Sequence, residues 1–428
     1  MENLELSGRM PDPSLRPGMS EPHCLGCGAP LTRTWVDLGV SPLANSYVAA
    51  DEAGRPDAVY PLRAMVCDRC LLVQLDQLVP REAIFNSGYA YFSSYSDSWL
   101  AHCRRYVADV VDRFHLGPSS QVVEIASNDG YLLQYFAQRG IPVLGVEPSA
   151  SVAQAAQAKG IPTEIAFFGE ATARALSARG DQADLIAAKN VLAHVPDIND
   201  FAKGVAMLLK PEGVFTVEFP HLLNTIRGVQ FDTIYHEHFT YLSLLAVERV
   251  FERQGLRVFD VQETQTHGGS LRVFACLGDA AFEATPAVAA MRRTEAAAGL
   301  GGPSGYAGFE TRIRRVRDDL LAFLDGARRE GASVAAYGAA AKGNTLFNYC
   351  GVTSRDIAFV ADRSAAKQGK LLPGSRIPIL APEAIDAARP DFVLIVPWNL
   401  SDEIEAHLAS IRAWGGRFVT AIPELRVE

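Results

Sequence analysis

One stretch limits the possible folds more than any other, because it has the pattern of strand, tight turn, helix and strand. Residues 121–125 are an apolar strand, residues 126–130 a turn of small residues, residues 131–139 a helix, and residues 142–146 a second strand that ends at Glu147. Such a unit holds a nucleoside at the carboxyl ends of parallel strands, with the acid on the ribose hydroxyls. We therefore predict an α/β protein built on a Rossmann-like sheet.

The turn in this unit is poor in glycine, and this bears on the ligand. A pyrophosphate needs a backbone that approaches closely over glycines, whereas Ser127, Asn128 and Asp129 offer polar groups and negative charge. A cationic sulfonium with an amino acid tail suits Asn128 and Asp129 better than NAD does. We predict S-adenosylmethionine (SAM) as the cofactor, and a sheet without ligand is the alternative. The expected contacts are Ala126, Ser127, Asn128, Asp129, Gly130, Glu147, Pro148 and Asn190.

Four cysteines form two CxxC knuckles, Cys24 with Cys27 and Cys67 with Cys70. Two residues between thiolates let a tight turn present both sulfurs to one ion, and two such turns complete a tetrahedral shell suited to zinc. Reduced free thiols or a redox pair are the alternatives. Four thiolates leave no position for substrate or water, so we predict a structural zinc.

A second alternation of strands and helices begins at residue 333. Residues 333–338 are an expected strand, and Lys342, Gly343 and Asn344 open the next helix. A turn of small residues with a lysine before a helix N-terminus can bind an anion, so we predict that a nucleotide diphosphate rests there. The alternative is NAD with Asp362 on its ribose, although the single glycine at Gly338 is a weak dinucleotide signature.

The charge of the chain argues against nucleic acid as a partner. The chain has 428 residues, a formal net charge of -9 and an isoelectric point near 5.6, whereas proteins that bind phosphate backbones concentrate positive charge. Residues 1–22 are polar and carry no apolar signal region, and no later run reaches the length of a membrane span. We expect a cytoplasmic protein, a monomer with no membrane partner, whose first 22 residues are a disordered tail.

Residues 235–241 crowd two imidazoles, a carboxylate and two phenols between apolar segments. These side chains can move protons near neutral pH. A metal pair or a hydrogen-bonded surface loop are the alternatives. On a strand, His236 and His238 would share a face and Glu237 would point away, so the three would not converge on one ion.

The motifs together resemble the deoxysugar C-methyltransferase family, which acts on nucleotide-linked 4-keto sugars. The resemblance runs from about residue 23 to the C-terminus, and it is carried by the two knuckles and by SPLANSYV, YAYFSSYSDSWL, VVEIASNDGYLLQYF, GVEPS, NVLAHVPD, EFPHLL, FDTIYHEHFTYLS and THGGSLRVF. It implies methylation at C-3 of a 4-keto sugar, with dTDP as the expected nucleotide. It also implies a C-terminal domain that anchors the sugar nucleotide across a cleft from the methyl-donor domain.

The resemblance also assigns catalytic roles. The base maps to His238, and Tyr235, Glu237, His194 and Tyr89 form the rest of the site wall. Carbon methylation beside a ketone needs a base of near-neutral pKa and donors aimed at the enolate oxygen. Physical reasoning agrees on the residue types but leaves His236 and His238 equal as the base.

One residue departs from the pattern expected of the family. Lys189 stands beside Asn190, where we expect a neutral residue, and a second cation would lie near the sulfonium. We therefore expect the Lys189 side chain to point to solvent. Two other functions stay open, an RNA methyltransferase with a zinc ribbon and a non-catalytic scaffold that retains the fold.

The expected domains follow from these units. They are a zinc-binding domain at residues 23–85, a SAM-dependent methyltransferase domain at residues 86–280, a helical connector at residues 281–332 and a C-terminal α/β domain at residues 333–428.

Overall fold

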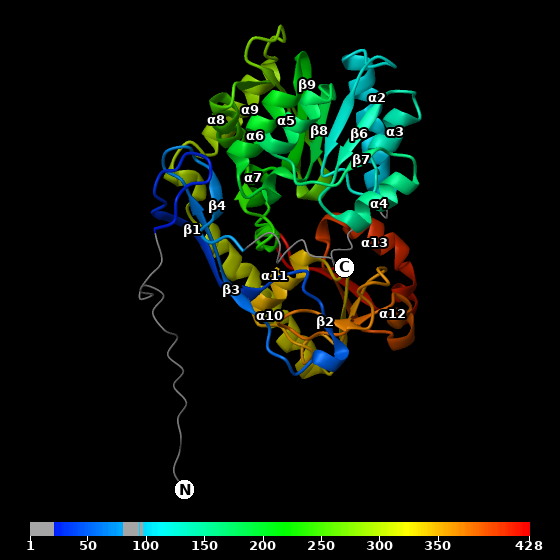
Figure 1. The fold of residues 1–428 in the computed structure, drawn as a ribbon. Helices are drawn as coiled ribbons and strands as arrows, with labels where there is room; N and C mark the ends of the chain where they lie inside the picture. Colours follow the sequence, from blue (N-terminus) through cyan, green and yellow to red (C-terminus); the bar gives the residue numbers. More distant parts are fainter. Residues whose placement is uncertain (1–20, 80–93, 95–96) are drawn as a thin grey trace.

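The protein is described by a computed structural model that covers residues 21–79, 94 and 97–428. The largest element is a seven-stranded sheet, shown in cyan and green at the top of Figure 1, with the strand order β11-β12-β9-β8-β5-β6-β7. Its strands are β5 (Val122–Ile125), β6 (Val143–Val146), β7 (Thr163–Glu164), β8 (Ala183–Lys189), β9 (Leu209–Pro220), β11 (Leu256–Thr264) and β12 (Ser270–Leu277).

The order of this sheet creates the place where a ligand is expected. After β5 the chain moves outward to β6 and β7 and then returns to β8 on the other side of β5, and these strands and β9 are parallel. The carboxyl ends of β5 and β8 therefore lie at the point where the order reverses, which is where open parallel sheets bind ligands. The strand β12 runs antiparallel to both of its neighbours. This arrangement confirms the predicted α/β class.

Helices cover both faces of the sheet. One face packs against α2 (Asp97–Arg113), α3 (Leu133–Ala137) and α4 (Ala150–Ala158). The other packs against α5 (Glu170–Ala178), α6 (Ile198–Leu208), α8 (Leu244–Arg253) and α9 (Pro286–Ala297). The short α7 (Leu222–Arg227) follows β9. The helix expected at residues 131–139 is shorter than predicted, because α3 spans only Leu133–Ala137.

The N-terminal sheet contains a strand from much later in the chain. Its order is β1 (Arg33–Pro42), β3 (Val59–Val66), β4 (Val73–Leu75) and β10 (Thr240–Tyr241). Because β10 is the end of the 235–241 segment, this segment is fixed between the N-terminal sheet and the seven-stranded sheet.

The C-terminal domain is a second, mostly parallel sheet, coloured orange and red in Figure 1. Its strands, in spatial order, are β16 (Ile379–Leu380), β14 (Val360–Ala361), β13 (Val334–Tyr337), β17 (Phe392–Ile395), β18 (Arg417–Thr420) and β19 (Arg426–Val427), and only β19 is antiparallel to its neighbour. Its helices are α11 (Ala341–Cys350), α12 (Glu383–Ala388) and α13 (Ser401–His407).

The helix α10 (Phe309–Glu330) lies between the N-terminal sheet and the C-terminal domain. Trp35 on β1 stacks on Phe309 at the start of α10, with 4.5 Å between ring centroids. One buried apolar cluster runs from β1, β3 and β4 through α10 to α11 and β13. The N-terminal sheet and the C-terminal domain therefore share one packed core.

An arm of the N-terminal domain crosses to the C-terminal domain at the bottom of Figure 1. Its strand β2 (Val48–Ala49) pairs with β15 (Lys370–Leu371), and Arg376 forms an ion pair with Asp57 at 2.5 Å. We call residues 43–58 the crossing arm. Within the described ranges, no helix combines the length and the apolar character that a membrane span requires.

Candidate functional site

Three residues near the point where the strand order reverses have left-handed φ angles, which usually occur at glycine. Ala126 and Asn128 follow β5, and Asn190 follows β8, and their φ angles are 54°, 50° and 54°. Left-handed φ angles in non-glycine residues cost energy and cluster at sites where a ligand is held. All three are predicted SAM contacts, and the fold brings them to the same edge of the sheet.

Glu147 follows β6 at this edge, and Pro148 comes next in the chain. The Glu147 side chain is buried, and its two oxygens accept the backbone N–H of Asn128 at 3.0 Å and of Ser149 at 2.8 Å. Burial raises the pKa of Glu147, and the two N–H groups oppose that rise. An acid at this position fits the ribose hydroxyls of a nucleoside.

The turn between β5 and α3 provides a second polar group. Asp129 is buried, and its Oδ2 accepts hydrogen bonds from Lys159 at 2.8 Å and from Ser94. Its Oδ1 is buried without a hydrogen-bond partner among the described residues. The Ser127 side chain packs against Gly145, where an added Cβ would lie 2.3 Å from Ser127 Oγ.

These features fit SAM. A buried acid at the end of β6, an unsatisfied carboxylate oxygen at Asp129 and left-handed backbone at the ends of β5 and β8 surround the sheet reversal. Buried acceptors without partners are costly unless a ligand or water satisfies them. Gly130, with φ 78°, completes the turn.

The expectation that Lys189 points to solvent is wrong. Its side chain is buried, its Nζ lies 2.7 Å from Glu218 Oε2, and the ammonium lies 3.9 Å from the centre of the Tyr106 ring. Burial lowers the pKa of Lys189, and the charge of Glu218 opposes that shift. The carboxylate satisfies the ammonium inside the protein, so exposure to water is not needed.

Residues 235–238 form a turn and not a strand. His238 N–H donates to Tyr235 C=O at 2.9 Å, and the following Phe239 N–H donates to Ala193 C=O at 2.7 Å. The second bond ties the segment to the short helix Leu192–His194, which follows β8. The site wall is therefore held against the edge of the sheet where the methyl donor is expected.

His238 lies at the centre of a group of aromatic rings. Its ring centroid is 4.7 Å from that of His194 and 4.1 Å from that of Tyr235. His238 Nδ1 lies 2.7 Å from Thr233 C=O, and because a carbonyl can only accept, Nδ1 carries the hydrogen. In the neutral ring the lone pair is then on Nε2, which is the atom able to take a proton.

Both histidines of this group are kept neutral. Burial is the main reason that the pKa of His238 lies well below its usual range, and a proton on the neighbouring His194 would lower it further. Burial lowers the pKa of His194 to about 4. A neutral imidazole can accept a proton, but a pKa well below neutral makes His238 a weaker base than the near-neutral base expected from the sequence.

His236 points to the N-terminal sheet. Its Nε2 lies 3.1 Å from Pro61 C=O, and its ring contacts Tyr60 edge-on at 5.8 Å between centroids. The two histidines therefore have different surroundings and do not share a face, as a strand would have required. The structure thus distinguishes His236 from His238, which the residue types alone did not.

Glu237 is buried and accepts a hydrogen bond from Asn45 Nδ2 on the crossing arm at 2.6 Å. Burial raises the pKa of Glu237 to about 7, and the bond from Asn45 opposes that rise. The Tyr47 hydroxyl next along the arm donates to Ala339 C=O at 2.7 Å. The arm thus connects the site wall to the C-terminal domain. Tyr89 lies outside the described residues.

The three predicted anion-binding residues, Lys342, Gly343 and Asn344, differ in the hydrogen-bond donors that they have left for a ligand. Lys342 is half-buried, and its Nζ lies 2.8 Å from Asn399 Oδ1. The Asn344 side chain donates to Ala44 C=O on the arm. The backbone at Gly343 packs so closely that an added Cβ would lie 2.6 Å from Val396. Lys342 is therefore the member of the three whose side chain has donors to spare. Asp362 accepts the N–H of Ala339 at 2.7 Å.

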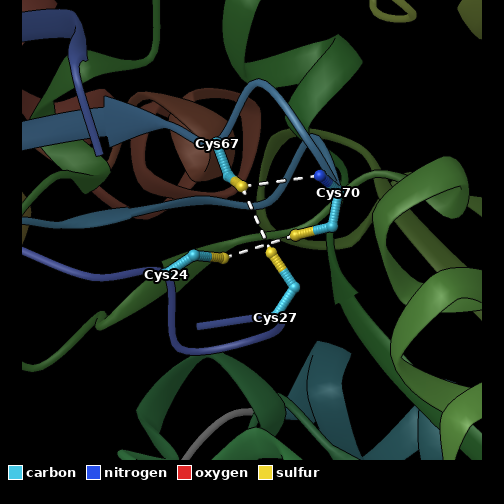
Figure 2. Close-up of side chains that lie close together, drawn as sticks. All are labelled: Cys24, Cys27, Cys67 and Cys70. Atoms are coloured by element: carbon cyan, nitrogen blue, oxygen red, sulfur yellow. Dashed lines mark hydrogen bonds between the residues drawn. The ribbon is translucent and has the colours of Figure 1, made fainter. Parts of the chain in front are cut away.

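The four knuckle cysteines converge, as Figure 2 shows. Their sulfurs all lie within 4.8 Å of one another, and this is the one such cluster of metal-ligating side chains found in the residues that the structure describes. A tetrahedral zinc with Zn–S bonds of about 2.3 Å needs sulfurs ~3.8 Å apart. The four cysteines therefore fit zinc.

The two knuckles have the same local geometry. In each, the N–H of the first cysteine donates to the C=O of the residue five places later. The C=O of that cysteine accepts the N–H of the residue four places later. That residue has a positive φ in both knuckles, 70° at Gly28 and 62° at Leu71. Asn199 on α6 and Arg253 on α8 bond to carbonyls of the first knuckle, so the metal site rests on the seven-stranded domain.

Several residues that bond to the predicted site residues, or lie near them, were not singled out in the sequence. They are Asn45, Asp232, His267, Trp398 and Asn399. The first three fall inside the SPLANSYV, FDTIYHEHFTYLS and THGGSLRVF motifs, which provided a signal. Nothing in the local sequence marked Trp398 and Asn399.

Comparison with known proteins covers nearly the whole chain. Family models match at residues 24–85 (a zinc binding domain), 99–261 (a methyltransferase domain) and 265–423 (a C-methyltransferase C-terminal domain). The C-methyltransferase NovU of Streptomyces niveus is 38% identical over 405 residues, which is 95% of this chain and 96% of NovU.

More distant matches cover the methyltransferase part. The ubiquinone biosynthesis O-methyltransferase of Bradyrhizobium diazoefficiens is 30% identical over 117 residues, 27% of this chain and 46% of that protein. The solved structure of a SAM-dependent methyltransferase from Mesorhizobium loti covers 41% of this chain and 99% of its own, with 15% identity and a TM-score of 0.33.

Proposed function

Because the chain belongs to the family of SAM-dependent C-methyltransferases with an N-terminal zinc-binding domain, we propose that it methylates C-3 of a nucleotide-linked 4-keto deoxysugar. We expect dTDP as the nucleotide and the biosynthesis of a natural-product deoxysugar as the setting. The observation that carries the proposal is the tautomer of His238, whose Nδ1–H is held by Thr233 C=O and whose Nε2 is left to accept a proton.

The reaction needs a carbanion beside the ketone. His238 Nε2 takes the C-3 proton, and the electron pair of the broken C–H bond moves toward the 4-keto oxygen. Thr233 C=O then stabilises the imidazolium through the same hydrogen bond that fixes the ring. His194 and Tyr235 pack against the ring and keep its orientation.

The other residues bind and orient. Asn128, Asp129, Glu147 and Asn190 would hold SAM at the ends of β5, β6 and β8, and bound SAM supplies the electrophilic methyl group. Burial of the site keeps water away from the carbanion. Zinc would take no part in these steps, because four thiolates fill its shell and leave no position for substrate or water.

The test uses labelled SAM and a panel of nucleotide-linked 4-keto sugars, scored for label bound to carbon. In His238→Asn the Asn amide can still donate to Thr233 C=O, but the Nε2 lone pair is lost. We expect turnover to disappear while calorimetry shows SAM binding unchanged, because the proposed SAM contacts are on other elements.

His236→Gln is the matched control. The Gln amide can replace the Nε2–H bond to Pro61 C=O, and His236 faces away from the proposed base. We expect it to keep most of the turnover. Near-normal activity in His238→Asn, or label that appears on RNA and not on any sugar, would overturn the proposal.

A further inference from the structure

Lys342 is a half-buried ammonium that forms no direct ion pair with a carboxylate of the described residues. Its Nζ donates to the amide oxygen of Asn399 at 2.8 Å and lies 4.5 Å from the centre of the Trp398 ring. Across the described ranges, no carboxylate lies within 4.0 Å of this ammonium. An ammonium has three N–H donors, so after the bond to Asn399 two remain for a ligand. An ammonium in such a place is suited to bind an anion.

One short helix bonds both to Trp398, whose ring lies beside Lys342, and to the proposed base. The 3-10 helix Phe231–Thr233 lies directly before the site wall. Asp232 Oδ2 accepts the indole N–H of Trp398 at 2.8 Å, and the next carbonyl, that of Thr233, accepts His238 Nδ1–H at 2.7 Å. The ring under the Lys342 ammonium and the ring of His238 are therefore fixed by adjacent residues.

Lys342 is near enough to two histidines to affect their charge. The positive charge of Lys342 contributes to the lowered pKa values of His238 and His267. Burial lowers the pKa of Lys342, and the charge of Asp232 opposes this shift. Asp232 is itself buried, and burial raises its pKa to about 6.

A diphosphate suits this place less well than a single developing charge. The buried carboxyl of Asp232 would repel two fixed negative charges, and the Asn344 side chain is already bound to Ala44. A ketone carries no charge until its neighbouring proton leaves. One ammonium can meet that single charge when it forms.

We propose that Lys342 is a further catalytic residue, whose ammonium binds the 4-keto oxygen of the sugar and stabilises the enolate that forms there. As the C-3–H bond breaks, its proton goes to His238 Nε2, its electron pair forms the C-3–C-4 double bond, and the carbonyl π pair moves onto the oxygen beside Lys342. When C-3 takes up the methyl group of SAM, the C-3–C-4 π pair forms the new bond, the pair on oxygen restores the ketone, and the methyl–sulfur bond pair leaves with S-adenosylhomocysteine. This inference rests on the proposed sugar substrate.

Proton exchange isolates this step. With S-adenosylhomocysteine in place of SAM, methyl transfer is impossible, and loss of the C-3 proton of dTDP-4-keto-6-deoxyglucose to deuterated water reports enolate formation alone. Lys342→Met keeps much of the side-chain length and removes the charge. We expect exchange and kcat to fall ~100- to 1,000-fold, the range for loss of one oxyanion donor, with SAM affinity unchanged.

Two further variants make the test specific. Lys210→Met removes a half-buried lysine paired with Asp184 at the opposite, amino ends of β8 and β9, and exchange should be normal. Asn399→Asp places a carboxylate on the Lys342 ammonium and should slow exchange without loss of SAM binding. It tests the same charge even if Lys342→Met does not fold.

The outcomes are separable. A Lys342→Met enzyme with normal exchange and a raised KM for the sugar nucleotide would assign Lys342 to the diphosphate and overturn the inference, as would normal exchange in Asn399→Asp. If the wild type neither methylates nor exchanges any sugar of the panel, the proposed function fails instead.

Discussion

At the scale of single residues, Glu237 shows how burial and one hydrogen bond set a charge. Its pKa rises from 4.5 to about 7 because its carboxylate is removed from water, and Asn45 is the side chain that opposes the rise. The acid is therefore only partly ionised at neutral pH. A carboxyl in this state can donate or accept a proton beside His238 without a large free-energy cost.

The burial of Glu237 predicts a pH-dependent stability. A raised pKa in the folded state means that the folded protein holds the proton more tightly, so this contribution is complete below pH 4.5 and is lost as the pH rises to about 7. Relative to Glu237→Gln, the wild type should lose roughly 3 kcal/mol of unfolding free energy over that range. Urea unfolding of both proteins at pH 5 and pH 8 measures the difference.

Asn45→Ala is the companion variant, because it removes the donor and should move the window to higher pH. Parallel pH curves for the wild type and Glu237→Gln would show that the carboxyl has an ordinary pKa.

At the scale of elements, a buried network joins α2 to the seven-stranded sheet. Glu218 on β9 accepts hydrogen bonds from His102 on α2 at 2.7 Å, from Lys189 on β8 at 2.7 Å and from Arg272 on β12 at 2.9 Å. Four elements therefore meet at one carboxylate. Glu218 stays ionised, because Lys189 first and then His102 and Arg272 hold its pKa well below the usual range against the effect of burial.

Removing this carboxylate should cost stability. Glu218→Ala leaves the cations of Lys189 and Arg272 buried without their partner, and such a loss costs about 3–5 kcal/mol. Chemical unfolding measures the cost, and exposed Glu263→Ala, which should change stability by less than ~0.5 kcal/mol, is the control. An effect of Glu218→Ala as small as that of the control would mean that the network contributes no net stability.

Local patterns predicted the elements that depend on neighbours in sequence. The strand, turn and helix around β5, the acid after β6 and both cysteine knuckles follow from spacing alone, and the structure has them in place. The burial of Lys189 could not be predicted, because its partners, Glu218 on β9 and the ring of Tyr106 on α2, lie far from it in the sequence. Residues 235–238 have apolar flanks that indicate a strand, but the bonds to Tyr235 and Ala193 make a turn.

At the scale of the whole molecule, the zinc knuckles belong to the same body as residues 235–241, the proposed site wall. The first knuckle is bonded to α6 and α8, and β10 of the site wall is the fourth strand of the N-terminal sheet. The family relationship could be expected from the motifs. The contact between Asn45 and Glu237, 192 residues apart, depends on how the domains pack and could not.

Zinc removal should therefore stop catalysis without abolishing cofactor binding. Metal analysis should give one zinc per chain, and a chelator should destabilise the N-terminal sheet and the site wall while the proposed SAM contacts on β5, β6 and β8 remain. Methyl transfer and SAM calorimetry, measured before and after chelation, check this. Cys350→Ser, outside the knuckles, should keep its zinc, and full activity in metal-free protein would contradict the expectation.

The crossing arm has a consequence for engineering new sugar specificities by recombination. Tyr47 bonds to Ala339, β2 pairs with β15, and Asp57 pairs with Arg376, so the arm and the C-terminal domain have matched surfaces. A chimera joined at the border of the C-terminal domain would combine the arm of one parent with the contact surface of another. Hybrids of related enzymes should inherit residues 43–58 and 339–376 from the same parent.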